Sequence, residues 1–167
     1  MVDSGRRRAI MARNAPQSGA PETSNREAIA MVSGSCLCGQ LHYELDETRA
    51  GPAVHCHCRD CQRVTGSGKA TVVLIPEDAI DLRGDYKLYD SRGTDGSHVH
   101  RGFCPDCGGQ MLTFVDEIPG AVFVKAGTLD ESAWLTVDAN CWTDSASPWS
   151  PVSDDLPGFH ANPDLQG

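Results

Sequence analysis

The chain has 167 residues, of which 40% are hydrophobic and 22% charged, the size and mixture of one ordinary globular domain. Its formal net charge is −9 and no Lys or Arg follows Lys125, so we expect its surface to repel the phosphate backbones of nucleic acids. No apolar run approaches the roughly 20 residues that a membrane helix needs, so we expect neither a nucleic-acid partner nor a membrane span.

Residues 1–30 are rich in Ala, Arg, Ser, Asn and Pro and lack apolar periodicity, which predicts a disordered N-terminal extension. Met31 stands directly before the first cysteine motif, so both Met1 and Met31 are candidate translation starts. Only a short apolar stretch follows the three arginines at 6–8, which argues against a signal peptide. We therefore predict a cytoplasmic protein, in which thiols stay reduced and clustered cysteines indicate metal binding or catalysis rather than disulfides.

Short alternating segments separated by turns predict a mainly β domain over residues 31–167. We predict strands at residues 40–45, 70–75, 86–89, 109–115 and 121–126, and one helical turn at residues 59–64. The segment 144–167 has many Pro and Gly residues and is predicted to be irregular, packed by Trp149 and Phe159.

Two cysteine pairs predict a closed metal site. Cys104 and Cys107 stand three apart and precede Gly108, which is the form of a zinc knuckle that supplies two ligands. Cys36 and Cys38 alternate along an extended segment, so both thiols face the same point. Together the four thiolates predict a structural zinc that ties the start of the domain to its middle.

A third cluster, Cys56, Cys58 and Cys61, predicts a site of a different kind. Cys56 and Cys58 share one face of a strand, and Cys61 returns to the same point after one turn. Three thiolates leave the fourth position of a zinc ion open, which is typical of catalytic zinc. We interpret His55 and His57, on the other face, as packing or surface residues. The rival interpretation is that His57 completes the site and makes it inert.

The three motifs, GSCLCG at 34–39, HCHCRDC at 55–61 and FCPDCG at 103–108, resemble the glutathione-dependent formaldehyde-activating family. This family is also called the GFA or CENP-V-like family, and the resemblance covers roughly residues 33–160. It implies a mainly β fold with small sheets around the zinc sites, a Mss4-like architecture. It also implies a structural zinc on the four cysteines and a catalytic zinc on the three. The chain departs from many members at Asn140-Cys141-Trp142, near which they often carry a His.

The resemblance implies a zinc-dependent carbon–sulfur lyase or synthase that joins a thiol, glutathione, to a small aldehyde, formaldehyde. The chemistry agrees, since a free thiol has a pKa of about 8.5 and coordination to zinc removes its proton. Glutathione also needs cations for its two carboxylates. We predict that Arg59, Arg63 and Lys69, beside the middle cluster, contact it, and the alternative is that they are solvated surface charges.

Two other functions stay open, since a fold with metal sites does not establish turnover. The first is a zinc-stabilised binding module, and the second is a thiol redox sensor that loses zinc from the three-cysteine site. We interpret Cys141 as a buried apolar filler, and Trp142 and Trp149 as packing residues. No oligomeric state is predicted.

Overall fold

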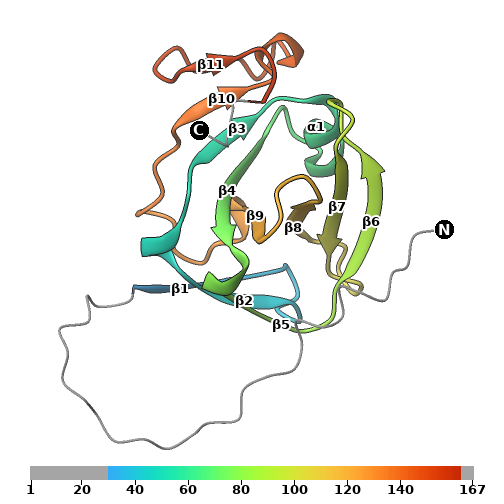
Figure 1. Cartoon of the computed structure of the whole chain (residues 1–167), viewed down its shortest axis with the longest axis vertical. Helices are drawn as coiled ribbons and strands as arrows, with labels where there is room; N and C mark the ends of the chain where they lie inside the picture. Colours follow the sequence, from blue (N-terminus) through green and yellow to red (C-terminus); the bar gives the residue numbers. More distant parts are fainter. Residues whose placement is uncertain (1–29, 163–167) are drawn as a thin grey trace, which may run out of the picture.

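The computed structural model describes residues 30–162, in which two β-sheets dominate (Figure 1). The predicted N-terminal extension therefore lies outside the described residues, except for residue 30. The smaller sheet has the antiparallel order β1-β2-β5, with β1 at Met31–Ser35, β2 at His42–Asp46 and β5 at Ile80–Arg83. The mainly β prediction is confirmed.

The larger sheet has eight strands in the order β11-β10-β3-β4-β9-β8-β7-β6. They are β3 (Ala53–Cys56), β4 (Ala70–Pro76), β6 (Lys87–Arg92), β7 (His98–Phe103), β8 (Gln110–Val115), β9 (Ala121–Lys125), β10 (Ala139–Cys141) and β11 (Gly158–Phe159). The pairs β10–β3 and β10–β11 are parallel, and the others are antiparallel. The sheet is strongly curved, so β3 and β4 face β6 and β7 with β8 and β9 between them (Figure 1).

Between residues 30 and 162, helical structure is confined to short segments. The helix α1 (Arg59–Thr65) lies at the end of the curved sheet opposite the smaller sheet (Figure 1). Four 3₁₀ turns are η2 (Glu47–Arg49), η3 (Glu77–Ala79), η4 (Ala126–Thr128) and η5 (Thr143–Ser145). No helix among residues 30–162 is long and apolar enough to cross a membrane.

The five predicted strands correspond to β2, β4, β6, β8 and β9, and the predicted helical turn is α1. The strand expected to carry Cys56 and Cys58 is β3, which ends at Cys56 and does not reach Cys58. The strands that the sequence did not predict are β1, β5, β7, β10 and β11. Their alternation is hidden, because β7 carries two His, an Arg and a Gly, and β10 has only three residues. Such strands form because neighbouring strands pair with them, not because of their own pattern.

Alternate residues of β9 face two separate cores. In β9, Val122 and Val124 are buried in the larger core, which lies against the four-cysteine group and contains Cys36 and Cys104. Phe123, between them, packs on a smaller core around the three-cysteine group. This two-residue period is the reason that each cysteine group has its own apolar surroundings.

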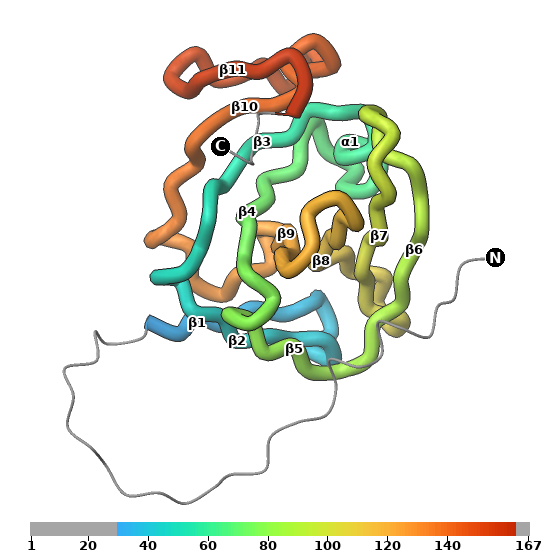
Figure 2. The backbone as a smooth tube through the Cα atoms, viewed as in Figure 1, coloured from blue at the N-terminus to red at the C-terminus, as the bar shows by residue number. Residues whose placement is uncertain are grey.

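The C-terminal segment adds β10 and β11 to the edge of the larger sheet, beside β3 (Figure 2). The prediction that Trp149 and Phe159 pack this segment is wrong, because their exposed fractions are 69% and 40%. Backbone pairing with β3 holds the segment instead. The buried Gln62 amide adds a hydrogen bond of 2.8 Å to the Ser145 carbonyl oxygen.

Candidate metal centres

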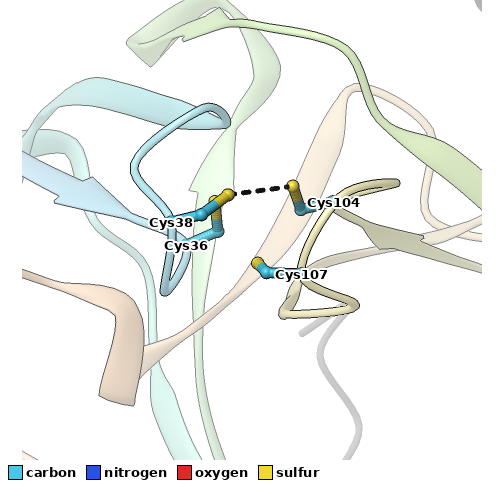
Figure 3. A group of neighbouring side chains, drawn as sticks. All are labelled: Cys36, Cys38, Cys104 and Cys107. Carbon is cyan, nitrogen blue, oxygen red and sulfur yellow. Dashed lines mark hydrogen bonds between the residues drawn. The ribbon is translucent and has the colours of Figure 1, made fainter.

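Two turns bring four cysteines together. Cys36 and Cys38 come from the β1–β2 turn, and Cys104 and Cys107 come from the β7–β8 turn (Figure 3). All four sulfur atoms lie within 4.8 Å of one another, with 3.5 Å between Cys36 and Cys38 and 3.7 Å between Cys38 and Cys104. The group that the sequence predicts therefore exists in the fold and could hold a metal ion.

Backbone conformation shapes this group. Gly108 has φ +71°, a left-handed conformation that an L side chain rarely adopts, and its N–H donates to the Cys104 carbonyl oxygen at 3.0 Å. The Leu41 N–H donates to Cys36 Sγ at 3.3 Å. Burial opposes ionisation of Cys36, but the Leu41 amide and the neighbouring thiols outweigh it and lower the pKa of Cys36 to about 6. A backbone hydrogen bond favours the Cys38 thiolate, but desolvation and the neighbouring thiols outweigh it and raise the pKa of Cys38 to about 12. The group therefore favours one thiolate that the remaining thiols stabilise.

The second group forms where β3 runs into α1. Cys56 ends β3, Cys58 is the N-cap of α1, and Cys61 lies in its first turn, with all three sulfur atoms within 4.8 Å of one another. The Cys61 N–H donates to Cys58 Sγ at 3.3 Å. Hydrogen bonds from the Cys56 and Cys61 thiols lower the pKa of Cys58 to about 2. The group thus shares protons around one thiolate, and a cation would displace those protons.

The two histidines beside this group have partners elsewhere. His57 is fully buried, and its Nε2 lies 3.2 Å from Asn140 Oδ1, to which it donates. His55 Nδ1 lies 2.9 Å from Thr71 Oγ1, and burial lowers the pKa of His55. Neither ring belongs to a metal-binding group within residues 30–162. The interpretation that His57 completes the three-cysteine site therefore finds no support in this geometry.

Cys141 lies beside the three-cysteine group. It is 2% exposed, as expected of an apolar filler, and its thiol donates to the His55 carbonyl oxygen at 3.6 Å. However, β10 pairs with β3 so that Cys141 is directly opposite Cys56, and the Cys141 thiol is the largest cause that raises the pKa of Cys56. Nothing in the sequence indicated this neighbour, because 85 residues separate the two cysteines.

A cavity of about 340 Å³ opens over the three-cysteine group. One wall is formed by Cys56, Cys58, Cys61 and Cys141. The lining also includes residues of β4, β7, β8 and β9, namely Val72, Val99, Arg101, Thr113, Val115, Phe123 and Lys125. The four-cysteine group does not line this cavity. One candidate metal centre therefore lines a cavity of small-molecule size, whereas the other does not line it and has Cys38 exposed at the surface.

The predicted glutathione contacts lie away from the cavity lining. Arg59, Arg63 and Lys69 are not among the lining residues, and the Arg59 guanidinium donates to Gln62 Oε1 at 2.6 Å. Their assignment stays a prediction. The cavity is lined instead by Arg101 and Lys125, each 7% exposed. Sequence reasoning missed both. Lys125 ends an apolar alternating strand, which is a readable signal, whereas the mixed sequence of β7 gives no such signal for Arg101.

The comparison with protein families agrees with these motifs. A family profile described as "Glutathione-dependent formaldehyde-activating enzyme" matches residues 31–145, more than half of the chain, and spans both cysteine groups. A crystal structure of a Rhodobacter sphaeroides protein is similar at 23% identity and a TM-score of 0.46, over 59% of this chain and 87% of that chain. No curated protein sequence matches significantly.

Proposed function

Because this chain belongs to the glutathione-dependent formaldehyde-activating family, we propose that it is a zinc-dependent carbon–sulfur lyase or synthase. Its substrates would be glutathione and formaldehyde, and its product S-hydroxymethylglutathione. In this proposal Cys56, Cys58 and Cys61 hold the catalytic zinc. The structural zinc is held by Cys36, Cys38, Cys104 and Cys107.

The thiol groups fit zinc in chemistry and in spacing. A tetrahedral zinc ion with Zn–S bonds of about 2.3 Å needs sulfur atoms about 3.8 Å apart. The sulfur separations of 3.5 Å between Cys36 and Cys38 and 3.7 Å between Cys38 and Cys104 are close to that value. Thiolate ligands alone also favour zinc over the harder ions magnesium and calcium.

The observation that carries the proposal is the difference between the two groups. The three-cysteine group lines a cavity of about 340 Å³, a volume within the range of small-molecule sites, whereas the four-cysteine group does not. Three protein ligands facing a cavity is the arrangement of a catalytic zinc, and four ligands is that of a structural one. A binding module without turnover would not need the open position.

Zinc, when bound, would keep an incoming thiol ionised at neutral pH and so supply a thiolate nucleophile. The thiolate sulfur forms a bond to the aldehyde carbon, and the C=O electron pair moves to the oxygen, which takes up the proton that the thiol released. The apolar side chains of Val72, Val99 and Phe123 line the cavity, and such a lining disfavours water beside the aldehyde.

The test has two measurements on reduced protein. The first is its zinc content, and the second is its catalysis of glutathione–formaldehyde exchange, monitored by NMR. We expect two zinc ions per chain in the native protein and one in Cys58→Ser, which should also lose the acceleration of exchange. Cys141→Ser is the matched control for zinc content, since Cys141 lies beside the group but outside it. The same zinc content in the native protein and Cys58→Ser would contradict the proposal.

Redox sensing is the second candidate function, favoured by the position of Cys141 opposite Cys56. Adjacent strands lie about 4.8 Å apart, and disulfides form at Cα separations of about 4.4–6.8 Å. Two thiols and one hydrogen peroxide would give a disulfide and two waters, removing Cys56 as a ligand. Mass spectrometry of peroxide-treated protein tests this, and absence of a Cys56–Cys141 peptide pair would refute it.

A further inference from the structure

Lys125 is a buried cation without a partner. It ends β9, and the alternation of that strand directs Phe123 and Lys125 into the cavity while Val122 and Val124 face the larger core. Lys125 is 7% exposed, and within residues 30–162 the structure shows no hydrogen bond or ion pair of its side chain. Its Nζ atom is not among the fully buried side-chain atoms that lack a partner, so the ammonium is accessible from the cavity and available to an anionic group of a ligand.

The other charged side chains that line the cavity already have partners. The Arg101 guanidinium contacts the Ser91 hydroxyl and lies 3.7 Å from an Asp60 carboxylate oxygen. Asp95 accepts a hydrogen bond of 2.7 Å from the Asn162 amide. Glu117 accepts hydrogen bonds from the N–H and the ring of His98 at about 3.0 Å. Lys125 is thus the charged lining group left for a ligand.

The three-cysteine group is the source of negative charge near Lys125. Three thiolates around a zinc ion would carry a net charge of −1, and Cys56, Cys58 and Cys61 line the same cavity as Lys125. This places Lys125 near the atoms that would react. The carboxylates of glutathione are several bonds from its sulfur, so a cation at this place is better suited to the reacting atoms than to those carboxylates.

We propose that the Lys125 ammonium binds the aldehyde oxygen as negative charge develops on it during carbon–sulfur bond formation. This inference rests on the proposed function. As the thiolate sulfur bonds to the carbonyl carbon, the C=O electron pair moves to the oxygen, and the ammonium donates a hydrogen bond to it. The proton released by the thiol then returns to that oxygen. Lys125 therefore acts on the transition state more than on the bound thiol.

The first test needs no turnover and uses two probes. Glutathione sulfonate carries anionic oxygens beside the position of the thiol sulfur, and S-methylglutathione carries none. We expect the native protein to bind the sulfonate more tightly, and Lys125→Met to lose about 10- to 100-fold of sulfonate affinity while S-methylglutathione affinity stays unchanged. Lys125→Arg should keep the preference, and Lys87→Met, at an exposed lysine of β6, is the matched control.

Kinetics give the second test. Lys125→Met should lower kcat by about 100- to 1,000-fold with little change in KM for glutathione. Zinc content and the thermal unfolding midpoint of Lys125→Met establish whether this variant folds. If it does not fold, Lys125→Gln is used in its place. A native protein without sulfonate preference, a Lys125→Met that keeps it, or an unchanged kcat overturns the assignment. If the native protein prefers glutathione sulfonate but does not catalyse glutathione–formaldehyde exchange, the proposed function is refuted while the anion site at Lys125 is retained.

Discussion

The two cysteine groups should differ in how much they stabilise the fold. Cys38 and Cys104 are 66 residues apart, so a metal ion there closes a long loop between two turns. Cys56 and Cys61 are only five residues apart, so a metal ion on the second group closes a short loop. The loop-closure term, 1.5 RT times the logarithm of the loop-length ratio, gives a difference of about 2 kcal/mol.

We therefore expect Cys104→Ser to lower the free energy of unfolding by about 2 kcal/mol more than Cys58→Ser does. The melting midpoint should fall by about 4–8 °C more, at about 2–4 °C for each kcal/mol in a chain of this size. Serine at position 58 also remains a good N-cap for α1, which keeps that variant folded.

The assay is urea unfolding followed by circular dichroism in reducing buffer with zinc, with the zinc content of each variant measured in parallel. Equal losses of stability in the two variants, or a larger loss in Cys58→Ser, would refute the argument from loop length. So would a Cys104→Ser protein that keeps two zinc ions.

Three further predictions follow from single positions. Gly108→Ala should lower the free energy of unfolding by about 1 kcal/mol, because the φ of +71° at this position strains an L residue. Gly127 has open space around it and no positive φ, so Gly127→Ala should leave the free energy of unfolding unchanged in the same assay. Burial raises the pKa of Tyr43 to about 12 from 10.0, so the phenol ionises first in the unfolded chain. The free energy of unfolding should therefore be unaffected below pH 10 and fall as pH rises towards 12, and Tyr43→Phe should remove that part of the fall. Arg63→Ala should leave glutathione affinity within about twofold by calorimetry, because Arg63 does not line the cavity; a large loss would restore the sequence-based assignment.

The sequence predicted the strongly periodic strands and both cysteine groups for the same reason, which is that the signals are local. Cys56, Cys58 and Cys61 meet because a strand and one helical turn suffice to join them. The zinc knuckle at Cys104 and Cys107 is equally local, and only its pairing with Cys36 and Cys38 needed an inference about four-coordinate metals. The strands without a clear period were missed, because pairing with neighbours determines them.

By itself, then, the sequence determined the mainly β class, the family and which thiols could share a metal ion. Only the tertiary structure decided what faces the open group. The parallel pairing of β10 with β3 brings Cys141 to Cys56. The arrangement of the larger sheet places Lys125 and Arg101 in the cavity that the three cysteines line. The predicted cations Arg59, Arg63 and Lys69 do not line it. The physical reason is that proximity along the chain predicts a turn, but proximity across a sheet depends on strand order and register, which no short motif encodes.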